Sequence, residues 1–89
     1  MNMKMVVLFA HWCPKCNLMM PIVDECEKNY EGKLKVVRID VEQEEGKMEE
    51  YDAQIVPTFI LFKEGCEVLR MAGLLGEKTF YERLDGALE

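Results

Sequence analysis

The chain lacks a surplus of positive charge. Its 11 lysines and arginines stand against 17 aspartates and glutamates, which gives a formal net charge of −6 at pH 7. Proteins that bind nucleic acid need a cationic surface to neutralise the phosphate groups. The charge balance therefore argues against nucleic acid as a partner.

Long apolar segments are missing as well. The apolar stretch Met5 to Ala10 spans only six residues. A membrane-spanning helix needs about 20 apolar residues, and the apolar region of a signal peptide needs about 7 to 15. We therefore predict a protein without membrane association that stays in the cytoplasm, where thiols are kept reduced.

Proline is scarce, with three residues, whereas hydrophobic residues make up 49% of the chain. This composition excludes an intrinsically disordered protein, because such chains are poor in apolar residues. A length of 89 residues allows one folded domain. We therefore predict a single domain over residues 1–89, and we expect a monomer.

Alternating and helical patterns of hydrophobic residues predict seven elements. Strands are expected at Met3–Ala10, Leu34–Ile39, Thr58–Phe62 and Glu67–Ala72, and helices at residues 14–30, 43–53 and 76–89. A crossover helix makes the first two strands parallel, and the hairpin that follows adds two antiparallel strands. The predicted fold is therefore α/β, in the order β-α-β-α-β-β-α, with a four-stranded mixed sheet flanked by three helices.

The motif Cys13-Pro14-Lys15-Cys16 lies where the first predicted strand ends and the first helix begins. A helix N-terminus favours an anion, because it presents unpaired N–H groups and the positive end of the helix dipole. The thiolate is such an anion and is the nucleophile in disulfide exchange, and Lys15 adds positive charge beside it. We therefore predict Cys13 and Cys16 as a redox-active pair, with Cys13 at the exposed helix edge and Cys16 turned inward.

A metal site is the main alternative for these two cysteines, because two nearby cysteines in a cytosolic chain indicate either redox chemistry or metal binding. A structural zinc site needs four ligands. Cys26 lies about 15 Å from Cys16 along the same predicted helix, Cys66 is expected at a remote hairpin tip, and His11 is expected to be an exposed loop residue. The sequence therefore predicts no metal ligand set, although a cluster shared between two molecules stays an open alternative.

Four segments carry a resemblance to a known family. They are Phe9 to Cys16, which contains a tryptophan before the first cysteine, then Ile55 to Thr58, Phe62 to Gly65, and Gly73. In this order and spacing they resemble the active-site segment, the approach to the cis-proline, the hairpin and the late glycine of the thioredoxin superfamily. The resemblance covers nearly the whole chain and implies the thioredoxin fold.

The resemblance also implies a reaction. Cys13 would attack a substrate disulfide and Cys16 would resolve the mixed disulfide that results. No separate cofactor is expected, because the Cys13–Cys16 disulfide is reversible and electrons would come from a flavin-dependent reductase of the thioredoxin-reductase type. The expected substrates are protein disulfides.

A substrate-binding surface follows from the same resemblance. Trp12 would form an apolar rim, Pro57 would be preceded by a cis peptide bond, and the backbone of Val56 would pair with the bound peptide like an added strand. The full set of expected substrate-binding residues is Trp12, Pro14, Lys15, Val56 and Pro57.

The sequence departs from thioredoxins at several positions. Val7 stands where they carry a buried acid, and the Pro-Lys dipeptide between the cysteines is closer to the glutaredoxin arrangement. The glutathione site of glutaredoxins is nevertheless not evident, because Ile55-Val56-Pro57 replaces Thr-Val-Pro and Gly73-Leu74-Leu75 replaces Gly-Gly. We therefore favour a small thioredoxin-like protein disulfide reductase. A glutathione-linked glutaredoxin, or a dedicated thiol-transfer or metal-binding partner protein, is the alternative.

Overall fold

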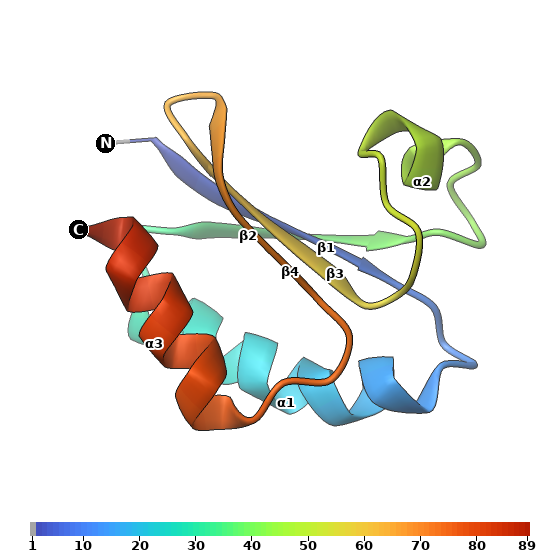
Figure 1. Ribbon diagram of the computed structural model, residues 1–89, viewed down its shortest axis with the longest axis horizontal. Helices are drawn as coiled ribbons and strands as arrows, with labels where there is room; N and C mark the ends of the chain where they lie inside the picture. The colour runs from blue at the N-terminus through green and yellow to red at the C-terminus, as the bar shows by residue number, and fades with distance from the viewer. Residues whose placement is uncertain (1) are drawn as a thin grey trace.

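The computed structural model describes residues 2–89, so only the first residue of the predicted domain lies outside it. The elements follow the predicted order (Figure 1). They are β1 (Met3–Phe9), α1 (Pro14–Asn29), β2 (Lys35–Asp40), α2 (Lys47–Glu50), β3 (Thr58–Lys63), β4 (Cys66–Ala72) and α3 (Glu77–Leu88).

The four strands form one mixed sheet in the order β2-β1-β3-β4, and β1 is parallel to β2 and antiparallel to β3. This arrangement confirms the predicted parallel pair and the hairpin. Phe9 pairs with Asp40, and Leu8 pairs with Thr58. The segments after β1, after β2 and before β3 therefore meet at one edge of the sheet, which is where the candidate site lies.

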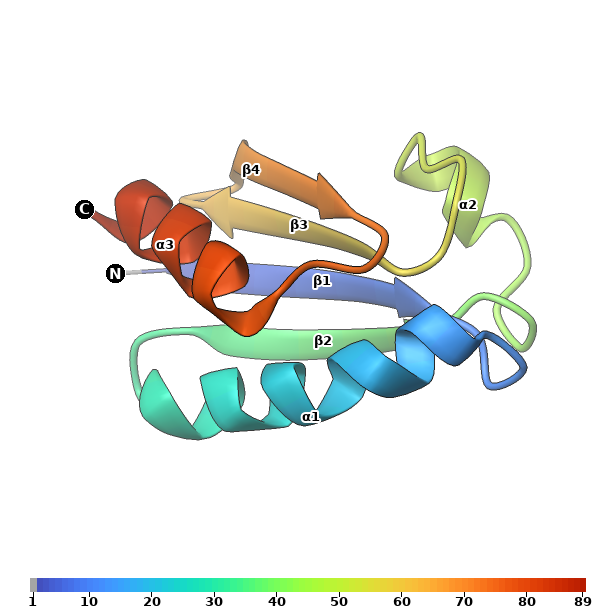
Figure 2. The same cartoon turned by 60° about the horizontal axis from the view of Figure 1, so that its bottom comes forward.

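Helices cover the two faces of the sheet unequally. Alternate residues of β1 point to opposite faces, as the period of a strand requires. Met5 and Val7 pack with residues of α1 and α3 in the larger core, whereas Val6 and Leu8 belong to a smaller core beside α2. Figure 2 shows α1 and α3 together on one face, with α2 at one end of the molecule.

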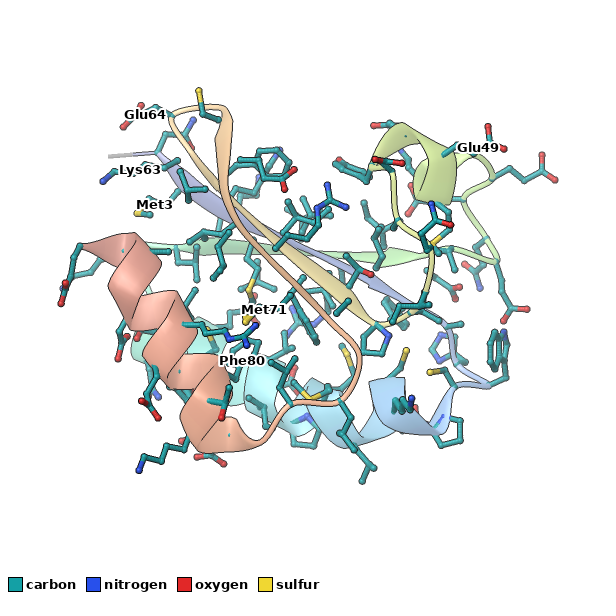
Figure 3. All side chains as sticks on the ribbon, in the orientation of Figure 1. Met3, Glu49, Lys63, Glu64, Met71 and Phe80 are labelled. Carbon is teal, nitrogen blue, oxygen red and sulfur yellow. The ribbon has the colours of Figure 1, made fainter. Side chains whose placement is uncertain are left out.

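The larger core is closed by aromatic and sulfur-containing side chains. Phe80 of α3 meets Phe59 of β3 edge to face, with ring centroids 5.3 Å apart. Met71 of β4 belongs to the same cluster, and Figure 3 shows it with Phe80 in the space between the sheet and α3. These residues pack α3 against the sheet.

The predicted helix over residues 43–53 is wrong in length, because α2 forms only at Lys47–Glu50. Gly46 precedes it with φ +80°, a left-handed conformation that stops a helix from starting earlier. Before that, the backbone N–H groups of Gln43 and Glu44 donate to the carbonyl of Asp40 and form turns. Asp52, with φ +52°, ends the segment.

Candidate active site

Cys13 is the N-cap residue of α1. Its backbone is extended, with φ −86° and ψ 113°, and Pro14 follows in the first turn. The missing N–H of proline costs little there, because the first N–H groups of a helix have no partner within it. The change from loop to helix therefore leaves the Cys13 side chain at the N-terminus of α1, as the sequence predicts.

Two backbone groups contact the Cys13 sulfur. The N–H of Cys16 donates to it across 3.3 Å, and the thiol itself donates to the carbonyl oxygen of Val56 across 3.6 Å. Cys13 is consequently only 5% exposed. The prediction of an openly exposed sulfur is therefore wrong in degree, because the segment before β3 covers it, although Cys13 remains the more exposed member of the pair.

The surroundings of Cys13 favour its thiolate. Burial raises the pKa of Cys13, but hydrogen bonds from the Cys16 thiol, from the backbone N–H groups of Cys16 and Lys15, and the charge of Lys15 lower it. The net result is a pKa below the ordinary value of 9.0. A lowered pKa at a helix N-terminus is typical of a nucleophilic cysteine.

Cys16 has the opposite character. It lies in the first turn of α1 and is fully buried. Burial, and then its hydrogen bond with Cys13, raise the pKa of Cys16 to about 11. Two cysteines three residues apart therefore differ in protonation: Cys13 is prepared to ionise and Cys16 keeps its proton.

The segment before β3 carries the predicted cis-proline. The Val56–Pro57 peptide bond is cis, as predicted. The hydroxyl of Thr58 donates to the carbonyl of Ile55 across 2.7 Å, and the N–H of Gly73 donates to the carbonyl of Pro57 across 2.8 Å. These bonds fix the segment against β3 and the end of β4, so that the carbonyl of Val56 faces Cys13.

Arg70 of β4 supports the same segment from its other end. One guanidinium nitrogen donates to the carbonyl of Asp52 across 3.1 Å, while two others bind both carboxylate oxygens of Glu67. A planar guanidinium suits this geometry, because its donors lie in a fixed fork. Sequence reasoning missed Arg70, since nothing in the residue order connects it with position 52.

A groove of about 620 Å³ opens beside Cys13. Four of the predicted substrate-binding residues line it, namely Trp12, Pro14, Lys15 and Val56. The fifth, Pro57, is buried behind them. Trp12 is 65% exposed, as a rim residue would be.

Four further residues of the groove were not predicted, and they are Val41, Met48, Gln54 and Ile55. Val41 follows directly after β2, at the sheet edge that also receives Cys13. The predicted parallel pairing of the first two strands was the signal that could have located it. Met48 lay within the helix predicted at residues 43–53, but nothing in the sequence connected it with Cys13.

His11 is an exposed loop residue, as predicted, but it has a partner. Its Nε2 lies 3.2 Å from Oδ2 of Asp40, and its ring meets Phe9 edge to face. The other carboxylate oxygen of Asp40 accepts the N–H of Glu42. His11 therefore links the loop before Cys13 to the end of β2.

The remaining cysteines lie elsewhere. Cys26 is buried in the larger core, and burial raises its pKa to about 12. Cys66 is exposed and pairs with Lys63 at the hairpin, at the end that Figure 3 marks with Lys63 and Glu64. Among residues 2–89, no three His, Cys, Asp or Glu side chains are placed to hold a metal ion.

The family model for thioredoxin matches residues 1–85. The chain belongs to the thioredoxin family. Members of that family are thiol–disulfide oxidoreductases, and this coarse function applies to the chain. None of the helices within residues 2–89 is both long and apolar enough to span a membrane.

Individual relatives agree with this assignment. The chain is 35% identical over 85 residues to "Thioredoxin Y1, chloroplastic" of Arabidopsis thaliana, covering 96% of the chain but only 49% of that protein. It is 30% identical over 84 residues to thioredoxin of Staphylococcus aureus, covering 94% of the chain and 81% of the relative. The chain thus spans about half the length of the first relative and most of the second.

Solved structures confirm the predicted fold. The germline-specific thioredoxin Deadhead of Drosophila melanogaster superposes with a TM-score of 0.86 at 25% identity, covering 96% of this chain and 80% of that one. A structure described as a malarial protein superposes over the full length of both chains, with a TM-score of 0.90 at 19% identity. The second likeness concerns the fold alone.

Proposed function

We propose that this protein reduces disulfides of other proteins by dithiol exchange through Cys13 and Cys16. The observation that carries the proposal is the contrast within the pair. The sulfur with the lowered pKa lies at the helix N-terminus beside an open groove, and the sulfur with the raised pKa is buried behind it. This is the division between an attacking and a resolving thiol.

The exchange has two steps. The Cys13 thiolate attacks one sulfur of the client disulfide, a Cys13–client bond forms, and the other client sulfur leaves and takes up a proton. Cys16 then loses its proton and attacks Cys13, so that the Cys13–Cys16 disulfide forms and the second client thiol is released. The client gains two electrons and two protons. Both electrons come from the protein, one proton comes from Cys16, and the other comes from solvent, which received the proton of Cys13 when that thiol ionised.

The buried carboxylate that resembling proteins use near this pair is absent, because Val7 occupies its position and is fully buried. Cys16 therefore has no carboxylate at that position to receive its proton. In the second step the Cys16 sulfur bonds to the Cys13 sulfur, the Cys13–client bond breaks, and the client sulfur leaves as a thiolate. That departing client thiolate is the group that accepts the proton from Cys16. The proposal predicts that resolution is the slower step.

A partner enzyme must restore the dithiol. A flavoenzyme of the thioredoxin-reductase type is the partner we propose, since the chain belongs to the thioredoxin family and needs a source of two electrons. A glutathione-linked reaction is not favoured. The net charge of −6 opposes an anionic tripeptide, and Ile55 and Leu74 occupy positions where glutaredoxins hold glutathione. Cytoplasmic location and a monomeric state stay predictions.

The test compares two electron sources. Insulin reduction is followed with NADPH and a bacterial thioredoxin reductase, and separately with glutathione, NADPH and glutathione reductase. The proposal expects turnover in the first system, none for Cys13→Ser, and full turnover for the matched control Cys66→Ser, whose thiol is remote and exposed. Turnover only in the second system would replace the proposal with the glutaredoxin alternative. Metal bound to anaerobically purified protein, without turnover in either system, would favour the metal-binding alternative.

A further inference from the structure

The loop between β1 and α1, residues 10–12, carries the exposed rim of the groove. Trp12 lines the groove and is 65% exposed, and Cys13 follows it directly as the N-cap of α1. Because most of the Trp12 side chain contacts solvent, few neighbouring atoms hold it in place by packing. The position of Trp12 beside Cys13 therefore depends on the bonds that fix the loop.

His11 provides one of these bonds. Its Nε2 lies 3.2 Å from Oδ2 of Asp40, a normal distance for a hydrogen bond from an imidazole N–H to a carboxylate. The His11 side chain is 74% exposed, whereas that of Asp40 is only 12% exposed. An exposed ring is thus attached to a carboxylate that its surroundings enclose, and the loop takes its position from the end of β2.

Asp40 is held in place independently of His11. It is the last residue of β2, where it pairs with Phe9 of β1, and its Oδ1 accepts the N–H of Glu42 across 3.0 Å. Among residues 2–89, neither a lysine nor an arginine lies within ion-pair distance of its carboxylate. The second carboxylate oxygen is therefore free to hold His11.

The loop has further bonds to α1 and β1. The side-chain amide of Asn17 in α1 donates to the carbonyl of His11 across 3.4 Å, and the N–H of Cys13 donates to the carbonyl of Ala10 across 3.2 Å. The His11 ring also meets Phe9 edge to face, with ring centroids 5.3 Å apart. His11 is thus held through its backbone by α1 and through its ring by the ends of β1 and β2.

The bond between His11 and Asp40 joins two segments of the groove. His11 directly precedes Trp12, Asp40 directly precedes Val41, and both of these following residues line the groove. Without the bond, Trp12 would move more freely relative to Val41, whereas Cys13 would keep its place as the N-cap of α1. A client that spans both segments would bind less tightly, while a small disulfide that needs only Cys13 would not.

We propose that His11 is a positioning residue for the reduction of protein disulfides. Through Asp40 it holds Trp12 in the place relative to Val41 that a bound polypeptide requires, and it takes no part in the thiol chemistry at Cys13. This inference rests on the proposed disulfide reduction and adds a residue that determines specificity, because its effect is confined to clients large enough to span the groove.

Three variants isolate the bond. His11→Phe keeps an aromatic ring against Phe9 and removes the nitrogen donor. His11→Gln places an amide donor near the former position of Nε2 and should restore the function. Tyr30→Phe is the matched control, because it also keeps its ring and loses one side-chain hydrogen bond to an aspartate, Asp85. Tyr30 follows the C-terminal end of α1, about 25 Å along the helix from Cys13.

Steady-state kinetics measures the effect on the client. With insulin, His11→Phe should raise KM about threefold and leave kcat unchanged, since an exposed pair of this kind contributes a factor of up to about five. With 2-hydroxyethyl disulfide, a small neutral substrate, kcat/KM should not change, and the pH midpoint for alkylation of Cys13 should also stay the same. His11→Gln and Tyr30→Phe should both behave like the unmodified protein.

A double variant tests whether His11 acts through Asp40. Asp40→Ala removes the acceptor and should raise KM for insulin at least as much as His11→Phe does. Adding His11→Phe to Asp40→Ala should then cause no further rise, because the bond is already lost. A second rise by the same factor as in the unmodified protein would show that His11 acts independently of Asp40 and would overturn the inference.

Trp12 offers a readout that does not depend on catalysis, because it is the single tryptophan of the chain. Time-resolved fluorescence anisotropy reports the motion of its side chain on the nanosecond timescale. His11→Phe should increase the amplitude of this local motion, whereas His11→Gln and Tyr30→Phe should leave it unchanged. A general loss of stability in a protein that remains folded would not change this motion.

The outcomes distinguish the inference from the function on which it rests. If the unmodified protein reduces neither insulin nor 2-hydroxyethyl disulfide, the proposed function fails. If it reduces both, but His11→Phe leaves KM for insulin and the Trp12 anisotropy unchanged, the function stands and the inference is wrong. The inference is also wrong if His11→Gln fails to restore KM, or if Tyr30→Phe raises KM equally.

Discussion

The backbone N–H of Cys16 donates a hydrogen bond to Sγ of Cys13 across 3.3 Å, so a sulfur serves as the N-cap acceptor of α1. Helices usually use oxygen from Ser, Thr, Asp or Asn at this position. A neutral thiol is a weak acceptor, whereas a thiolate is charged and faces the positive end of the helix. The cap therefore strengthens when Cys13 ionises, which joins the local structure to the reactivity.

The first prediction concerns the reactivity of Cys13. Alkylation by iodoacetamide should titrate with a midpoint below 9.0, because the pKa of Cys13 is lowered. Below pH 9 only one of the two active-site thiols should react, since burial raises the pKa of Cys16 to about 11. Mass spectrometry of the alkylated protein, taken at a series of pH values, gives the rate of alkylation at Cys13 and at Cys16. Lys15→Met should raise the midpoint, and a midpoint at or above 9.0 in the unmodified protein would contradict the N-cap argument.

The second prediction concerns stability in alkali. Burial raises the pKa of Cys16 to about 11 and that of Cys26 to about 12. In the unfolded chain both thiols ionise near pH 8.5, so above that pH the unfolded state binds fewer protons than the folded state. The free energy of unfolding of the reduced protein should therefore fall as pH rises from about 8.5 toward 11.

A substitution isolates the share of Cys26 in this fall. Cys26→Ala removes one titrating thiol, so the slope should become less steep by up to about 1.4 kcal/mol per pH unit. The packing contacts that are lost with this buried side chain lower stability equally at every pH, so they do not change the slope. Urea unfolding at pH 7, 9 and 10 measures this, with Cys66→Ala as the exposed control that should leave the slope unchanged. An equal slope in Cys26→Ala and the unmodified protein would argue against the raised pKa.

The third prediction concerns Arg70, which holds the carbonyl of Asp52 at the start of the segment that carries Val56. Arg70→Met keeps an apolar stem and removes the donors. One lost hydrogen bond is worth about 1 kcal/mol, which corresponds to about a fivefold lower kcat/KM for insulin. Reduction of 2-hydroxyethyl disulfide, which needs little of the groove, should change less. Arg83→Met, at an exposed position of α3, is the control. Equal losses for both substrates would indicate general destabilisation instead.

The strands and the Cys13–Cys16 pair could be predicted because their signals are local. The run from Met3 to Phe9 is apolar enough to identify a buried strand, and three-residue spacing at a helix start is visible in the sequence. The length of α2 was misjudged for a physical reason. Gly46 adopts a left-handed conformation, and the carbonyl of Asp40 captures the N–H groups that a longer helix would have used.

The groove was predicted only in part, because its parts come from positions far apart in the chain. Trp12 and Val56 carried a family resemblance, but Met48 lies more than 30 positions after Cys13 and has no motif of its own. The burial of the Cys13 sulfur was not predicted for the same reason, because it also depends on a contact between distant positions in the chain. Its partner, the carbonyl of Val56, is 43 positions away and belongs to the backbone, so no side-chain pattern indicates it.

The last prediction separates the roles of the two active-site cysteines. Cys13 is 5% exposed and Cys16 is 0% exposed, so a client sulfur can approach only the first. Cys16→Ser should therefore still attack insulin and then stop, leaving a covalent complex that persists under denaturing conditions and dissolves with dithiothreitol. Cys13→Ser should trap nothing, because the remaining thiol is buried and its pKa is raised to about 11.

Non-reducing electrophoresis measures the trapped complex. The double variant Cys16→Ser, Cys66→Ser is the necessary control, because Cys66 is exposed and could form an unrelated disulfide. The complex should be retained in this double variant, since Cys13 forms it. Trapping by Cys13→Ser but not by Cys16→Ser would reverse the assigned roles. Turnover retained in both single variants would show that the reaction does not pass through this dithiol, because a monothiol that cannot close the Cys13–Cys16 disulfide has no route to release its client.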